Sequence, residues 1–205
     1  ATLKGLATGE GATATSQKAA MEQITLSAKK LVVLVPTTEE LLQDAPAVFG
    51  QLLQEHMAQA MAAKLDDVFL LGTGAGEALG LVNAPCAIEV AKESGQVAST
   101  IVPRNLSKMV ARLAPGSFGR SVWLAHSSAV AQLFVLVERV ANAAASDWVG
   151  GISPGWFTTS PDGSMTLMGR PLIITDRLQP LGTSGDIVLT DLSQYLVGQV
   201  GEMRL

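Results

Sequence analysis

One long apolar pattern in the first half of the chain constrains the fold more than any other stretch. Apolar residues recur there at every fourth position, which is the spacing of one side of a helix. Asp44 can cap the first turn, Pro46 is tolerated inside that turn, and Gly72 can end the helix in a left-handed conformation. The pattern predicts a helix over residues 45–71 that is about 40 Å long, given the helical rise per residue. Its apolar positions are Phe49, Leu53, Met57, Met61, Leu65 and Phe69.

The opposite side of this helix carries few charges. A solvated helix of such length usually has many ion pairs on its exposed side. Small and amide side chains instead favour close packing, either in the core of the same domain or against another subunit. The residues on this side are Gln51, Gln54, Glu55, Gln59, Ala63 and Asp66.

The composition disfavours several classes of protein to which this chain could belong. Charged residues make up only 16% of the chain, against the usual quarter or so, which favours extensive contacts with other chains. The net charge of −4 and the lack of Lys/Arg clusters disfavour a dedicated nucleic-acid binder. Cys86 is the only cysteine, so an intrachain disulfide and a thiolate metal site are excluded, and no apolar run is long enough to cross a bilayer. Because the chain begins at Ala1 without a Met and ends abruptly at Leu205, we expect a fragment of a longer protein.

The segment before the long helix divides into two parts. Residues 1–20 are rich in Gly, Ala, Thr and Ser, and their composition predicts a mobile loop or arm. Residues 24–36 first alternate and then become continuously apolar. This pattern predicts a long strand, exposed at first and buried later, that Pro36 ends. A short capped helical turn is expected at Thr37 to Glu40.

The second half of the chain alternates helices and strands, which indicates an α+β domain. Helices are predicted over residues 106–113 and 129–140, the second capped by Ser127. Residues 141–163 are dense in Gly, Ser and Pro and predict an irregular loop that exposes Trp148 and Trp156. A strand or loose hairpin is predicted around residues 87–90 and 98–102. Further strands are predicted at 121–126, 165–168, 171–175 and 187–190, with a last one from Tyr195.

No constellation of residues supports a catalytic, cofactor or metal site. The glycine-rich turn Gly72–Gly80 lacks the GxGxxG spacing and follows a helix, so nucleotide binding is disfavoured. His56 and His126 are far apart and have no carboxylate at ligand spacing. A triad of His126, Ser127 and Asp191 lacks a nucleophile elbow, and Ser127 is better explained as a helix cap.

The sequence suggests structural or contact roles for a few other side chains. Asp66 and Asp67 are adjacent, so they project from different sides of the helix, and Asp67 is expected to accept hydrogen bonds from a neighbouring strand or loop. Trp148 and Trp156 suggest either a ligand platform or a contact at the rim of an assembly, and the second is favoured. The sequence assigns no role to Cys86.

Four separate blocks of the sequence, in this order and at these distances, resemble the major capsid proteins of tailed bacteriophages, which have the Hong Kong 97-like fold. The resemblance covers about residues 20–200, and the long helix lies between the first two blocks. The blocks are AKKLVVLVPTTEELLQDAP, LDDVFLLGTGAGEALGLVN, LMGRPLIITD and GDIVLTDLSQYLV.

The resemblance implies an α+β subunit with a spine helix, peripheral-domain strands, an extended loop that laps over a neighbour, and a mixed axial domain. Gly169, Arg170 and Pro171 would open a core strand of the axial domain, and residues 143–163 would point toward the capsomer axis. The N-terminal arm, the first half of the extended loop and the last peripheral strand would be missing. The three parts are residues 1–23 (extended loop), 24–80 (peripheral domain, spine helix 45–71) and 81–205 (axial domain).

The implied function is structural and not enzymatic. Subunits of a phage or prophage would assemble in the host cytoplasm into hexamers and pentamers of an icosahedral virion capsid around DNA, which they contact non-specifically. Scaffolding, portal and protease partners are implied, whereas a membrane partner and a cofactor are not. Lys18 lies near the crosslinking region of some relatives, but the local match is poor and no crosslink is predicted. An encapsulin-like compartment shell and a nucleotide-binding enzyme are the alternatives.

Overall fold

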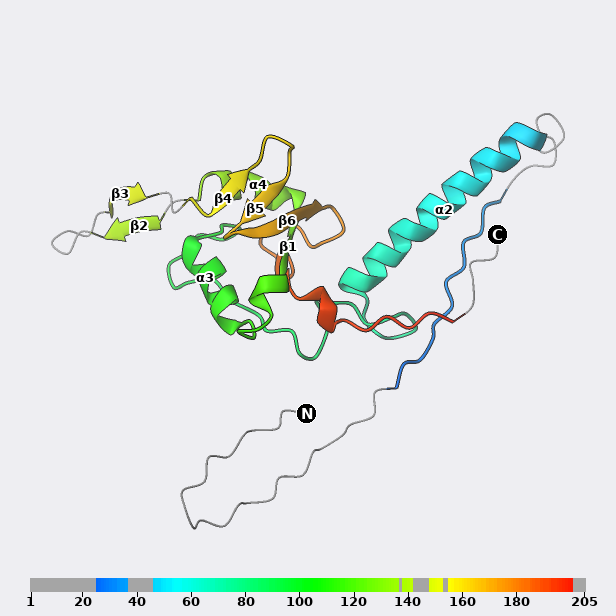
Figure 1. The fold of residues 1–205 in the computed structure, drawn as a ribbon, viewed down its shortest axis with the longest axis horizontal. Coiled ribbons are helices and arrows are strands. Elements are labelled where there is room, and N and C mark those ends of the chain that lie inside the picture. Colours follow the sequence, from blue (N-terminus) through cyan, green and yellow to red (C-terminus); the bar gives the residue numbers. More distant parts are fainter. Residues whose placement is uncertain (1–24, 37–45, 137, 142–147, 153–154, 201–205) are drawn as a thin grey trace, which may run out of the picture.

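The computed structural model describes residues 25–36, 46–136, 138–141, 148–152 and 155–200. Figure 1 shows one long helix standing apart from a body that holds the sheet and the other helices. The predictions for Lys18, the N-terminal arm and the turn at Thr37 lie outside the described residues. The helices are α2 (Pro46–Leu71), α3 (Pro103–Arg112) and α4 (Val130–Phe134); the strands are β1 (Val122–His126), β2 (Glu138–Ala141), β3 (Trp148–Ile152), β4 (Phe157–Thr159), β5 (Met165–Leu167), β6 (Arg170–Thr175) and β7 (Ile187–Thr190).

The long helix is confirmed, because α2 spans 26 residues and its first described residue is Pro46. The expectation of one apolar side is wrong. Each step of four residues advances about 40° around a helix, so the pattern winds through about 200° between Phe49 and Phe69. Among the described side chains of α2 only Val68 is buried, and Leu52 is 49% exposed. Within this chain α2 is therefore not a core helix.

Gly72 ends α2, but not through a left-handed conformation, because the positive-φ glycines nearby are Gly74 and Gly76. A Cβ atom on Gly72 would lie 2.2 Å from the carbonyl oxygen of Ala78. The close approach of the returning chain therefore requires glycine at this position. Thr73 and Leu79 form an antiparallel bridge across the reversal, which agrees with the tight turn predicted there.

The strands expected at residues 24–36 and from Tyr195 are not formed. Residues 25–36 and 195–200 are extended segments without a strand ladder, and most of their side chains are exposed. They approach each other where a Cβ atom on Gly198 would lie 3.0 Å from Leu26 Cδ1 (Figure 1). Two isolated extended segments are marginally stable in water without a third strand or a covering helix, which explains why the apolar pattern alone does not produce a sheet here.

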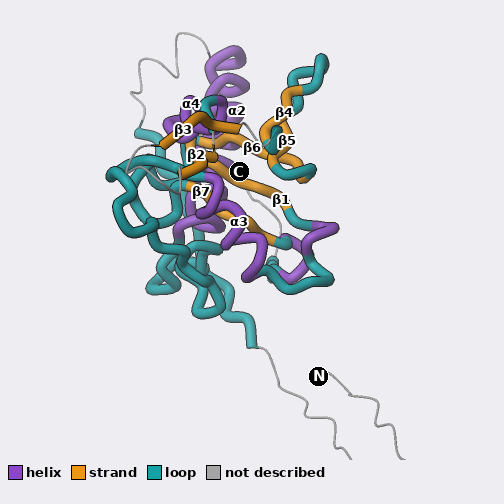
Figure 2. The backbone as a smooth tube through the Cα atoms, turned by 90° about the vertical axis from the view of Figure 1, so that its left-hand side faces the viewer, coloured by secondary structure: helices purple, strands orange, loops and turns teal. Residues whose placement is uncertain are grey.

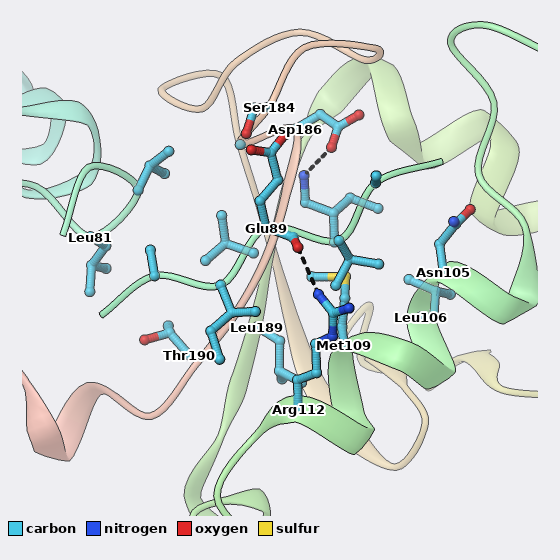
Figure 3. Close-up of a pocket in the computed structure, with 18 of the residues that line it drawn as sticks. Leu81, Glu89, Asn105, Leu106, Met109, Arg112, Ser184, Asp186, Leu189 and Thr190 are labelled. Carbon is cyan, nitrogen blue, oxygen red and sulfur yellow. Dashed lines mark hydrogen bonds between the residues drawn. The ribbon is translucent and has the colours of Figure 1, made fainter. Parts of the chain in front are cut away.

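The strands expected at 87–90 and 98–102 are also wrong. The Gln132 side chain takes the place of a neighbouring strand: its Oε1 accepts from the Ile101 N–H at 2.6 Å, and its Nε2 donates to the Ser99 carbonyl oxygen at 2.6 Å. Residues 84–101 form a loop beside β7, separated from it by a groove of about 870 Å³. Figure 3 shows Arg112 of α3 reaching across this groove to donate to the Glu89 carbonyl oxygen at 2.8 Å.

The body is built on a five-stranded mixed sheet with the order β4-β5-β6-β1-β7. β1 and β6 are parallel, and the other neighbours are antiparallel. Met168 and Gly169 join β5 to β6 with φ values of 52° and 74°, as a two-residue hairpin with a right-handed twist requires. The strands predicted at 121–126, 165–168, 171–175 and 187–190 are thereby confirmed to within one residue. Figure 2 shows α3 beside β1 and β7, as its apolar side predicts.

The helix predicted over residues 129–140 is wrong beyond Phe134. The chain leaves α4 and enters β2, which pairs with β3 in a separate two-stranded ribbon. The ribbon lies at the far end of the body from α2 (Figure 1). Cross-strand pairing therefore overrides the helical period at residues 138–141, and the expected irregular loop contains β3 and β4. His126 takes the cap role expected of Ser127, since its side chain accepts from the Ser128 N–H.

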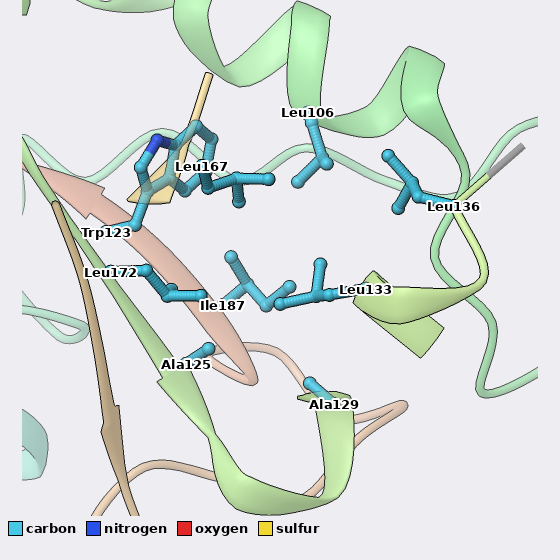
Figure 4. Close-up of a cluster of buried hydrophobic side chains, with 9 residues drawn as sticks. All are labelled: Leu106, Trp123, Ala125, Ala129, Leu133, Leu136, Leu167, Leu172 and Ile187. Carbon is cyan, nitrogen blue, oxygen red and sulfur yellow. The ribbon is translucent and has the colours of Figure 1, made fainter. Parts of the chain in front are cut away.

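The core lies between one face of the sheet and the helices α3 and α4. Leu106 points from α3 toward side chains of the sheet and of the α4 region (Figure 4). Trp156 packs against this cluster and is half-buried, so the expectation of an exposed Trp156 is wrong. The side chain of Trp148 lies outside the described residues. The cluster comprises Leu106, Trp123, Ala125, Ala129, Leu133, Leu136, Leu167, Leu172 and Ile187.

Candidate assembly surfaces and the base of the long helix

The residues considered for a catalytic triad serve separate structural roles. His126 Nδ1 lies 2.8 Å from the hydroxyl of Ser128, not of Ser127. Asp191 accepts hydrogen bonds from the backbone N–H and hydroxyl of Ser193 and pairs with Arg120 at 3.2 Å. His56 and Cys86 are exposed, and no cluster of three metal-ligating side chains occurs in the described part of the chain.

Asp191 is a buried charge at the end of β7. The pKa of Asp191 is lowered to about 2 from its ordinary 3.8. The largest cause is the hydrogen bond from the Ser193 hydroxyl, and Arg120 acts in the same direction. This arrangement fixes the end of the strand to the turn that carries Arg120. Its chemistry is that of a structural anchor, because the carboxylate is fully engaged by neighbours.

Several backbone donors at the glycine-rich reversal are occupied. Gly80, Leu81 and Val82 donate their N–H groups to the carbonyl oxygens of Gly72, Phe69 and Leu70 at 2.8, 2.9 and 3.1 Å. The Glu77 carboxylate accepts from the Thr73 N–H at 3.0 Å, and this bond lowers the pKa of Glu77. These bonds end the helix and reverse the chain, and the donors that they occupy are not free for a phosphate group.

Several contacts join the base of α2 to distant parts of the chain. Asp67 accepts from Arg177 at 3.3 Å, which confirms the acceptor role predicted for it. The Tyr195 hydroxyl donates to the Leu79 carbonyl oxygen at 2.7 Å, and its ring meets Phe69 edge-on at a centroid distance of 6.3 Å. Burial raises the pKa of Tyr195. Arg177 and Tyr195 were missed at the sequence level, although Tyr195 is the only tyrosine of an aromatic-poor chain.

The two extended segments expose most of their apolar side chains. Leu34 is 86% exposed and Val200 is 84% exposed. Grouped apolar side chains at a protein surface mark contacts with other molecules. None of the described helices combines the length and the apolar character that crossing a bilayer requires. The exposed apolar residues of these segments are Leu26, Val32, Leu34, Val35, Leu196, Val197 and Val200.

The solvent side of α3 is basic. Arg104, Lys108 and Arg112 recur at steps of four, opposite the buried Leu106, and the helix contains no acidic residue. Lys108 forms an ion pair with Glu93. These cations are not adjacent in the sequence, so the group was missed at the sequence level, and it is the helical spacing that brings them to one side.

A comparison with known protein families completes the description. The model of a family described as the phage capsid family matches residues 2–205. The match therefore covers α2, the sheet body and both extended segments. No curated protein and no solved structure matches the chain.

Proposed function

The chain belongs to the phage capsid family, and we propose that it forms the hexamers and pentamers of an icosahedral shell around the DNA of a tailed phage or prophage. The family comprises structural, non-enzymatic proteins of the virion capsid, and this chain is accordingly a phage capsid protein. Nothing in the family match favours the encapsulin-like alternative. Scaffolding, portal and protease partners, and assembly in the host cytoplasm, stay predictions.

One observation carries the proposal: the chain leaves a long helix and two apolar extended segments largely uncovered. Only Val68 is buried among the described side chains of α2, while the sheet body has its own core. A subunit that buries surface on many neighbours needs such surfaces, and symmetric shells form through many modest interfaces of this kind.

The proposed organisation follows the Hong Kong 97-like fold. We assign α2 and residues 25–36 to the peripheral domain (24–80), the sheet body to the axial domain (81–205), and residues 1–23 to the extended loop. The separation of α2 from the body supports the two-part division (Figure 1). The extended segment 195–200, at the end of the part 81–205, approaches residues 25–36 where Gly198 meets Leu26, and we propose that contact with neighbouring subunits adds both segments to a peripheral sheet.

Assembly of the purified chain tests the proposal. We expect closed shells or capsomers by electron microscopy and light scattering, and we expect Leu34→Asp to reduce assembly at least about tenfold, because it places a charge in a buried apolar contact. Ser27→Asp is the matched control, since it adds the same charge at an exposed polar position of the same segment. A wild-type chain that stays monomeric at all concentrations, or equal assembly of the two variants, contradicts the proposal.

We also propose that the basic side of α3 contacts packaged DNA through phosphate groups. Arg104 has no ion-pair partner within the described residues, and Lys108 keeps a side chain that is 51% exposed. A single subunit would bind weakly, and many subunits facing one DNA molecule would add their contributions.

Salt-dependent binding to duplex DNA tests this interaction. Replacing Arg104, Lys108 and Arg112 by Gln should reduce the slope of log K against log salt by about 0.9 for each phosphate group that the protein no longer neutralises. The control replaces the exposed Lys29, Lys30 and Lys64 by Gln, which removes the same number of charges elsewhere. An equal reduction in both variants would show an effect of net charge alone.

A further inference from the structure

α2 and the reversal that follows it are joined by hydrogen bonds into one unit. The last carbonyl groups of the helix are bonded to the returning chain, and Asn83 Nδ2 donates to the Leu71 carbonyl oxygen at 2.7 Å. The unit reaches from Pro46 to about Asn83. Among the described side chains of α2 the buried one, Val68, lies near this base, so we expect the direction of the helix relative to the sheet body to depend on contacts there.

In the described part of the chain the unit meets the body at several points, among them Val82, which lies beside Gly185. Two further contacts at the base of α2 differ in strength. The first is Tyr195, which combines a ring contact with Phe69 and a hydrogen bond to the Leu79 carbonyl oxygen. The second is the ion pair of Asp67 with Arg177, whose side chains are 36% and 44% exposed. Arg177 lies two residues after Thr175, the last residue of β6, and its backbone N–H donates to Thr175 Oγ1 at 3.2 Å, which fixes the ion pair to the sheet.

We propose that the Asp67–Arg177 ion pair is a releasable latch that sets the direction of α2 relative to the sheet body, with Tyr195 as the pivot. The pivot survives release because its contacts do not involve either charged residue. An exposed ion pair is weak and is screened by salt, so it can open without unfolding the chain.

Because α2 is long, a small rotation at its base moves its far end by several ångströms. The helix is about 39 Å long from its residue count, so a tilt of about 10° at the base moves its far end by about 7 Å. The use of this motion rests on the proposed function, in which one subunit must fit both hexamers and pentamers. The latch itself is a property of the single chain.

Single-molecule FRET between α2 and α3 tests the latch at concentrations too low for assembly. Dyes are attached in a Cys86→Ser background at Gln54→Cys on α2 and Ala111→Cys on α3, both exposed positions. Arg177→Gln and Asp67→Asn should each broaden the distance distribution and shift the closed-to-open ratio by up to about fivefold, the range of exposed ion pairs. Molar salt should reproduce this effect in the parent protein and add little to Arg177→Gln.

A charge exchange provides the decisive control. Asp67→Arg combined with Arg177→Asp should restore the narrow distribution, whereas Lys108→Gln, which breaks the ion pair with Glu93 inside the body, should leave the distribution unchanged. Unchanged distributions in the Asp67 and Arg177 variants, or a charge exchange that restores nothing, would overturn the latch. A failure of the chain to form shells would overturn the proposed function and leave this measurement unaffected.

Discussion

α3 turns Leu106 toward the core and its basic residues toward solvent, whereas α2 contacts the rest of the chain mainly at its base. The difference lies in the two sequences. In α3 the apolar and charged residues fall on opposite sides, so one face of the sheet can cover the apolar side of the helix. In α2 the apolar pattern winds around the axis, so no single surface of the same chain can cover it. The sheet body of the same chain therefore leaves most of the described side chains of α2 unburied.

The largest expected effect is on the α3 side of this comparison. Leu106→Ala should lower the free energy of unfolding by about 2–5 kcal/mol, because Leu106 is almost fully buried and its truncation leaves a cavity among tightly packed side chains. Denaturant unfolding at a concentration below assembly measures this decrease. A decrease under about 0.5 kcal/mol would mean that the body is loosely packed. α3 would then not differ from α2 in how tightly it packs within the chain.

A second expected effect concerns the pH dependence of the body. Because the pKa of Asp191 in the folded chain is about 2, below its ordinary 3.8, the ionised carboxylate stabilises the fold above about pH 4 and this contribution is lost as the pH falls toward 2. Asp191→Asn should therefore flatten the decline of melting temperature over that interval. Asp162 is a comparison on an exposed turn, where hydrogen bonds from Ser164 also lower the pKa of the carboxyl, so Asp162→Asn shows how much flattening a carboxylate outside the body's buried anchor produces. If the melting temperature of Asp191→Asn depended on pH as in the parent protein, the ionised Asp191 would not be the anchor of β7.

The same contrast explains which parts could be predicted from the sequence. The length of α2 and the strands β1, β5, β6 and β7 follow from local patterns and turn residues, as at Met168–Gly169, whereas β4 lies in the expected irregular loop. The segments at 24–36, 87–90 and 98–102 have strand-like patterns but lack a partner strand in the chain, or have Gln132 in its place. Pairing partners are non-local, so no local pattern could reveal them.

The contacts at the base of α2 could be predicted from the sequence only in part. The position of Asp67 indicated an acceptor, yet its donor Arg177 lies more than a hundred residues away. The side chain of Arg177 carries no local signal of this role, since a lone arginine after a strand is common at surfaces. Long-range pairs of this kind follow from the path of the whole chain, and a local sequence pattern contains only one half of each.

The smallest expected effect on stability lies on α2 and sharpens the comparison most. Met57→Gln should change the free energy of unfolding of the single chain by less than about 0.5 kcal/mol, because Met57 is only half-buried and Met and Gln have similar helix propensities. If a neighbouring subunit covers α2 as proposed, the same variant should weaken assembly, since a polar amide would replace an apolar side chain in that contact. Denaturant unfolding and light scattering on one preparation separate the two effects. If Met57→Gln destabilised the single chain as strongly as Leu106→Ala, α2 would be packed within its own chain, and its uncovered surface could no longer support assembly.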